Sequence, residues 1–170
     1  DGLSEKYFGT GGSSLGRFQS GPKGVTHTQR GIGKYTQSQI TAAFQMHGDL
    51  DVTADFADLA LAEVKLASCN LMLTFDGGFQ VGLRRRWQAA DDQRLVLAWV
   101  YPAKPGTEAA KAGAVSRSYD NFPTEILGGR FRIARRGDTI YVLVAEYDSE
   151  QFRVLTSRTI ETIGKRSAEV

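Results

Sequence analysis

Apolar residues recur at every second position on both sides of one tight polar turn between residues 129 and 155. A period of two is typical of β-strands, because successive side chains leave a pleated backbone on opposite faces. Glycine can adopt the positive φ that matches the twist of paired strands, so Arg136-Gly137-Asp138 is predicted to be the exposed turn of an antiparallel hairpin. In the first strand of this hairpin, Phe131 and Ile133 alternate with Arg130, Arg132 and Arg135.

Further strands follow from the same alternation. Residues 50–56 alternate without a break, which predicts a core face and an opposite face that carries the polar residues. Residues 71–75 and 79–87 flank a Gly-Gly turn and predict a second hairpin. After a third turn at residues 89–92, residues 94–101 are apolar on both faces, so this strand is expected at the centre of a sheet. The core residues predicted together are Ile133, Val142, Val144, Leu95 and Phe56, and the residues predicted to face outward are Asp49, Asp51, Thr53 and Asp55.

The remaining segments have weaker patterns. Residues 1–36 are rich in Gly, Ser and Thr and predict loops, with short edge strands near residues 15–18 and 25–28. Residues 9–14 resemble a phosphate-binding loop only in composition, so a flexible terminus is expected there. The other candidates are a strand at residues 114–119, a helical turn at residues 108–111, and closing strands at residues 151–156 and 158–163.

About eight to eleven short strands without a long amphipathic helix favour an all-β fold, either a two-sheet sandwich or a barrel. No repeat of fixed period is visible, which disfavours a propeller. We predict a single domain over residues 1–170. Within it, residues 1–36 form a loop-rich N-terminal wrap and residues 38–163 form the body.

Length, charge and cysteine content narrow the class of protein. A chain of 170 residues can bury a core without a disulfide or a metal. Its net charge of +2 gives no reason to expect nucleic acid as a partner. The lone Cys69 excludes an internal disulfide and lies in an apolar run, so a buried and unreactive thiol is expected. His27 and His47 lack further ligands at metal spacing, so no metal and no cofactor are predicted.

No apolar run approaches the ~18 residues of a membrane-spanning helix, so membrane insertion is not expected. No signal peptide is recognisable. The chain begins with Asp1 rather than methionine, which is compatible with a processed or excised segment and with a removed export signal.

Two motifs resemble the concanavalin A-like jelly-roll superfamily, namely GDLDVTADF at residues 48–56 and GRFRIARRGDTIY at residues 129–141. They are most similar to uncharacterised lectin- or laminin-G-like domains of large secreted bacterial proteins, which carry a Gly-Asp-Phe-x-Val-Thr-x-Asp-Phe strand and a Gly-x-Leu-Arg-Ile-x-Arg-x-Gly-x-x-Leu hairpin. The resemblance covers roughly residues 38–157 and implies an antiparallel two-sheet jelly-roll sandwich in a secreted or cell-surface protein. Both motifs are structural, and this fold serves lectins, glycosidases and interaction modules alike.

Laminarinase-type glycosidases of this fold place Glu-x-Asp-x-Glu on one inward strand, where one carboxylate attacks the sugar and another protonates the leaving oxygen. The nearest equivalent here is Asp49-x-Asp51-x-Thr53-x-Asp55, which has aspartates for glutamates and a threonine at the third place. Carboxylates on the polar face of a strand usually form a solvated or ion-paired surface. No catalytic residue is therefore predicted, and no two carboxylates are expected at glycosidase spacing in an open groove.

Arginines gather on two of the predicted strands. Arg84 and Arg86 share a polar face, whereas Arg85 follows the apolar residues before it toward the core side and is expected to emerge at the rim. In one interpretation, arginines pair with aspartates across strands, and this set comprises Arg84, Arg86, Arg130 and Arg132 with Asp49, Asp51 and Asp55. In the alternative, the same arginines form a basic face that binds sulfated or carboxylated glycans through bidentate contacts.

Sugars present apolar C–H faces that stack on aromatic rings, so glycan sites combine a Trp or Tyr with nearby amide and carboxylate groups. Trp87 at a strand end and residues 119–122, expected in the long loop, have this chemistry. Trp99 and Tyr101 share one face of a central strand and are expected in the core. The predicted carbohydrate-binding residues are Trp87, Arg86, Tyr119, Asp120 and Asn121.

The sequence thus predicts a non-catalytic binding or interaction module, with carbohydrate as the ligand class. Two alternatives stay open, namely a structural subunit that assembles through strand edges or sheet faces, and a glycoside hydrolase of the same fold. The expected partner is a glycan or a neighbouring protein, without nucleic acid, membrane insertion or cofactor. The ligand and the oligomeric state are left open.

Overall fold

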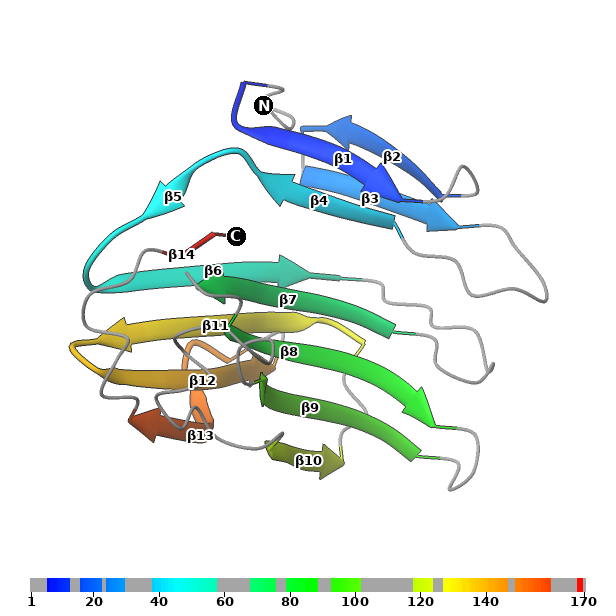
Figure 1. Cartoon of the computed structure of the whole chain (residues 1–170). Helices are drawn as coiled ribbons and strands as arrows, with labels where there is room; N and C mark the ends of the chain where they lie inside the picture. Colours follow the sequence, from blue (N-terminus) through cyan, green and yellow to red (C-terminus); the bar gives the residue numbers. More distant parts are fainter. Residues whose placement is uncertain are drawn as a thin grey trace. The chain divides into compact units, whose positions relative to one another are not determined.

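The computed structural model describes residues 6–12, 16–22, 24–29, 38–57, 68–75, 79–88, 93–101, 118–123, 127–146, 149–159 and 168–169. This part of the chain is all-β, with strands in antiparallel sheets and no helix (Figure 1). The chain divides into two compact units. The smaller contains Asp1–Gln45 and Glu169–Val170, and the larger contains Met46–Ala168.

The first sheet of the larger unit has the strand order β13-β12-β11-β6. Its strands are β6 (Leu50–Phe56), β11 (Gly129–Arg136), β12 (Thr139–Glu146) and β13 (Arg153–Thr159). The predicted hairpin is confirmed, because β11 and β12 pair over their whole length and Gly137 in the turn has a φ of 56°. Arg136, Gly137 and Asp138 are all exposed, as expected of this turn.

One face of this sheet is buried. Ile133, Val142 and Val144 are almost completely buried, and the ring of Phe56 packs on that of Phe131 with 4.6 Å between centroids. The alternation predicted for residues 50–56 is confirmed, since every second residue from Leu50 is buried or half-buried and the residues between are exposed. Leu95 is the remaining member of the predicted core, and its side chain is not among those that the structure describes.

The second sheet has the order β10-β9-β8-β7, continued by the two-residue strands β14 (Ala168–Glu169) and β5 (Gln45–Met46). Its longer strands are β7 (Ser68–Phe75), β8 (Phe79–Gln88), β9 (Gln93–Tyr101) and β10 (Ser118–Pro123). The β7–β8 hairpin and the interior position of β9 were both predicted correctly. Buried Leu73, Phe75, Val81 and Leu83 form its apolar face.

Residues 119–122 are not in a loop, as the sequence suggested. They belong to β10, which pairs antiparallel with β9 from Ser118 opposite Val100 to Pro123 opposite Leu95. The sequence around Asp120 and Asn121 has low β-propensity, and the backbone ladder to β9 overrides that local preference. Of the candidate strand at residues 114–119, the structure describes only residues 118 and 119, which belong to β10, and residues 114–117 lie outside the described residues.

Two arginines occupy positions that differ from the expectation. Arg85 is 1% exposed and does not emerge at the rim, and Arg135 is 2% exposed rather than on the polar face. Both continue the inward period of their strands, Arg85 after Leu83 and Arg135 after Ile133, so the pleat directs them into the interior. The Nε of Arg135 donates to the Gly137 carbonyl oxygen at 2.9 Å, and both arginines have further interacting groups.

The smaller unit contains two two-stranded sheets. β1 (Phe8–Gly12) pairs with β4 (Ser38–Ala42), and β2 (Gly16–Gly21) pairs with β3 (Gly24–Gln29). The two short strands predicted near residues 15–18 and 25–28 are thus present, while the flexible terminus expected at residues 9–14 is wrong for the part that forms β1. Within the described residues, no helix has the length and apolar character required to cross a membrane.

Some expectations concern residues outside the description. These are the turns at residues 76–78 and 89–92, the helical turn at residues 108–111, and the closing strand beyond residue 159.

Candidate functional site

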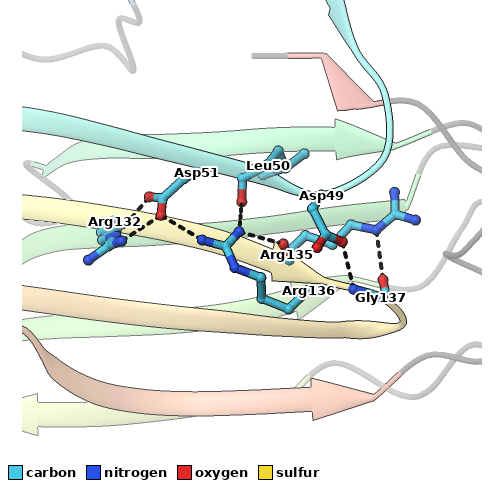
Figure 2. Close-up of polar contacts among 7 residues, drawn as sticks. All are labelled: Asp49, Leu50, Asp51, Arg132, Arg135, Arg136 and Gly137. Atoms are coloured by element: carbon cyan, nitrogen blue, oxygen red, sulfur yellow. Dashed lines mark hydrogen bonds and ion pairs between the residues drawn. The ribbon is translucent and has the colours of Figure 1, made fainter.

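The outer face of the β13-β12-β11-β6 sheet carries a group of polar and aromatic side chains that we call the arginine–aspartate cluster. Its members are Asp51, Arg130, Arg132, Arg136 and Phe152. Arg132 donates to Asp51 through Nε to Oδ1 at 2.7 Å and through Nη2 to Oδ2 at 2.5 Å. Arg136 donates from Nη2 to the same Oδ2 at 3.1 Å, so the carboxylate lies between two guanidinium groups (Figure 2).

The strand register explains this arrangement. Asp51 of β6 lies directly opposite Ala134 of β11, and Arg132 and Arg136 are the outward neighbours two positions on either side. Diagonal neighbours across an antiparallel pair are within reach of long side chains. The small Ala134 leaves room for both arginines to lean toward the carboxylate.

The β11–β12 turn is tied to the start of β6 by further bonds. The Gly137 amide donates to Asp49 Oδ1 at 2.7 Å, and Arg136 Nη1 donates to the Leu50 carbonyl oxygen at 3.0 Å (Figure 2). The same Nη1 also donates to the carbonyl oxygen of Arg135 at 2.9 Å. These contacts hold the Arg136 side chain between β6 and β11.

Phe152 covers the other end of the cluster. The guanidinium carbons of Arg130 and Arg132 each lie 5.0 Å from its ring centroid, which is cation–π distance. Arg130 also donates from Nη2 to the Ser149 carbonyl oxygen. Ala145 lies opposite Arg130 on the outer face and is only 2% exposed, so the segment before β13 folds over the sheet here.

The electrostatics of the cluster follow from its hydrogen bonds. The hydrogen bond from Arg132 lowers the pKa of Asp51, desolvation opposes this, and the charge of Arg132 together with Arg136 lowers it further. In turn, the hydrogen bond to Asp51 raises the pKa of Arg132. The cluster therefore presents an ionised carboxylate and fixed guanidinium donors at neutral pH.

Asp51→Asn should lower the free energy of unfolding by about 0.2–1 kcal/mol at pH 7, because the ion pair is partly exposed. A lowered pKa in the folded state contributes stability above the ordinary value of 3.8, and this contribution is lost as the pH falls through the lowered pKa. Urea titrations between pH 2 and pH 7 measure the difference between variant and wild type. A difference that grows on acidification would contradict the assignment.

The cross-strand interpretation of the arginines is confirmed for Arg132 and Asp51. It is wrong for Arg84 and Arg86, because β8 belongs to the other sheet and does not adjoin β6. Arg84 instead donates from Nε to Asn70 Oδ1 at 3.1 Å. For the same reason, the four arginines cannot form one basic sheet face.

The register also shows how the predicted carbohydrate-binding residues are distributed. Trp87 of β8 lies opposite Arg94 of β9, whereas Tyr119 of β10 lies opposite Trp99 of β9. These two positions on β9 are separated by roughly 17 Å along the strand, at about 3.4 Å per residue. The backbone therefore does not gather Trp87 and Tyr119 at one point of the sheet.

The other three predicted residues lie between these two levels. Asp120 and Asn121 lie opposite Ala98 and Leu97, and Arg86 lies opposite Leu95. The side chains of all five predicted residues lie outside the description, so their role in binding stays a prediction.

The cluster contains two residues that the sequence reasoning did not assign to a site. Arg136 shares the even-numbered face of Arg130 and Arg132, so the period of two could have included it. Phe152 lies in the closing strand predicted at residues 151–156, but β13 begins only at Arg153, and no sequence signal indicates that the Phe152 ring would lie beside the arginines of β11.

Cys69 and the histidines do not add a reactive centre. Burial raises the pKa of the Cys69 thiol to about 11, which keeps it protonated and weakly nucleophilic. Among the residues that the structure describes, no group of three or more His, Cys, Asp or Glu could hold a metal ion.

The fold and the cluster define an all-β protein of antiparallel sheets with a polar and aromatic outer face. The chain belongs to the family described as "Protein of unknown function (DUF1583) C domain", whose match covers residues 1–169. Neither a curated protein nor a solved structure matches the chain.

Proposed function

We propose that this chain is a non-catalytic carbohydrate-binding module and that the arginine–aspartate cluster contacts the sugar. The observation that carries the proposal is that Arg132 is fixed between the Asp51 carboxylate and the Phe152 ring while its side chain remains 33% exposed. A ring beside fixed donors and an acceptor is the combination that sugars require, since they offer C–H faces and hydroxyl groups together.

The carboxylates of Asp51 and Asp49, which offset two of the three charges of Arg130, Arg132 and Arg136, favour a neutral glycan over a dense polyanion. Two guanidinium groups share Asp51, and Asp49 lies at the adjacent turn, where it accepts from Gly137. Paired charges attract a dense polyanion weakly, whereas their remaining donors and lone pairs can still bind hydroxyl groups. Since hydroxyl contacts involve no net charge, we expect binding at this site to depend little on salt.

A jelly-roll sandwich is the architecture we propose for the larger unit. Each of its two sheets has one apolar buried face, and the first has a polar outer face. Two antiparallel sheets of this kind cover their apolar faces most simply by packing on each other. Such packing would leave the arginine–aspartate cluster on the outside of the sandwich.

The absence of catalysis is proposed from the chemistry of Asp51. A glycosidase needs one carboxylic acid whose pKa is raised, so that it can protonate the leaving oxygen. Arg132 and Arg136 shift the pKa of Asp51 in the opposite direction. Hydrolysis of a β-glucan by the wild type that Asp51→Asn abolishes would refute this part of the proposal.

Assembly through the β13 edge is the alternative that the structure disfavours. β13 has a register shift at Val142/Leu143, which is a bulge or irregularity. Arg153 and Arg158 of the same strand are exposed cations. Bulges and charged side chains are devices by which edge strands avoid pairing with other chains.

The test is a glycan-array screen, followed by calorimetric titration of any neutral glycan that binds. Phe152→Ala should weaken binding by up to about tenfold, because the C–H contacts that a sugar makes with one aromatic ring are worth up to about 1.4 kcal/mol. Val154→Ala, which removes an exposed apolar residue of β13, is the matched control and should leave affinity unchanged. Retained affinity in Phe152→Ala would exclude the cluster as the binding site. Loss of binding in a Trp87→Ala/Tyr119→Ala variant would place the site on the other sheet.

A further inference from the structure

The distribution of charge along the chain is strongly uneven. Between Lys6 and Gly48 there are five lysines and arginines and no aspartate or glutamate. This segment contains strands β1 to β4 of the smaller unit, and the whole unit, with Asp1, Glu5 and Glu169, has five cationic and three acidic side chains. The larger unit has sixteen of each. We propose that the smaller unit is a binding surface for an anionic polysaccharide, separate from the arginine–aspartate cluster.

The described part of this unit is open to solvent. Lys6 and Arg17 are exposed, and Ala42 is the only buried residue among the described side chains from Lys6 to Ala43. Two-stranded sheets are marginally stable by themselves, because they have little apolar surface to bury. A ligand that bridges the strands would add contacts that the unit lacks.

The described part of the smaller unit also carries aromatic rings. The Lys6 ammonium is 5.1 Å from the centroid of the Tyr7 ring, and Tyr7 is 47% exposed. On the β2–β3 pair, Phe18 lies opposite His27 with ring centroids 4.5 Å apart. Burial lowers the pKa of His27, so its ring is uncharged at neutral pH and the positive charge comes from lysine and arginine.

The composition favours a polysaccharide over other polyanions. The same segment contains fourteen serine, threonine and glutamine residues, which can bind sugar hydroxyl groups. Duplex DNA carries one charge per about 1.7 Å of its axis and usually meets clustered lysine and arginine. Here the five cations are spread over 29 positions, from Lys6 to Lys34, with no two adjacent. Such spacing suits a polymer with fewer charges and many hydroxyl groups.

The experiment measures binding of the full chain to heparin and to alginate at several salt concentrations. A Lys6→Gln/Arg17→Gln variant removes two cations of the smaller unit. An Arg153→Gln/Arg158→Gln variant removes two exposed cations of the larger unit and is the matched control. We expect the first variant to bind about tenfold more weakly, the second to bind like the wild type, and wild-type binding to weaken as salt is added.

Several outcomes would overturn the proposal. These are no binding of the wild type to either polysaccharide at low salt, equal losses in the two variants, and tighter binding to a single-stranded oligonucleotide or to phosphatidylserine vesicles at the same ionic strength. This experiment and the test of the proposed sugar site can fail independently. Phe152→Ala changes no residue of the smaller unit, and the neutral glycans used with it do not depend on the charges of Lys6 and Arg17. Thermal unfolding of each variant confirms that the fold is retained.

Discussion

Arg85→Ala is expected to lower the free energy of unfolding by about 2–5 kcal/mol, since it removes a large, almost completely buried side chain and leaves a cavity in its place. Arg85 is 1% exposed, has interacting groups, and lies opposite Cys69 in the β7–β8 hairpin. Its backbone amide and its charge both act to lower the pKa of the Cys69 thiol, against the larger effect of burial. The side chain is therefore part of the interior of this sheet.

Two variants make the Arg85 measurement specific. Arg84→Ala on the same strand removes a half-exposed arginine and should cost no more than about 1 kcal/mol. Arg85→Met keeps much of the volume without the charge, and should lose less stability than Arg85→Ala. Equal unfolding free energies for the Arg84 and Arg85 alanine variants in urea titrations would contradict the buried position.

Ile133→Ala is the second change for which we expect a large effect, a loss of about 2–5 kcal/mol in the free energy of unfolding. Ile133 is fully buried at the centre of β11, between Val52 and Val142 on the neighbouring strands. Truncation removes apolar contacts and leaves a cavity that paired strands on both sides cannot collapse to fill.

The matched control for this prediction is Val154→Ala on β13, where the side chain is 52% exposed and little burial is lost. Denaturant unfolding of both variants gives the comparison. A loss below about 1 kcal/mol in Ile133→Ala would mean that the apolar face of this sheet is not covered as described.

Local patterns in the sequence were sufficient for the strands that alternate. The face of each residue in 50–56 and the β11–β12 hairpin follow from the period of two and from Gly137. Arg132 and Asp51 could be predicted as partners because both lie at outward positions of their strands, and because the motifs at residues 48–56 and 129–141 resemble two motifs of the same family. β10 was missed because its sequence is poor in strand-forming residues and its structure depends on pairing with β9.

The burial of Arg85 and Arg135 shows what period alone leaves undecided. The period of two directs both side chains inward, but burying a guanidinium group costs free energy unless neighbouring groups compensate for the lost water. The sequence pattern does not show whether such groups are present. The candidate site depends on tertiary structure in the same way. Phe152 reaches Arg130 and Arg132 only because the chain before β13 folds across the sheet.

By itself, the sequence determined the all-β class, the inward and outward residues of the regular strands, and the acid-free segment from Lys6 to Gly48. These properties follow from neighbouring residues, since pleating and composition are local. The tertiary structure decided which arginines share a sheet, that Trp87 and Tyr119 lie far apart along β9, and that Asp51 lies between Arg132 and Arg136. Those relations depend on strand order and register, which backbone pairing between distant segments sets.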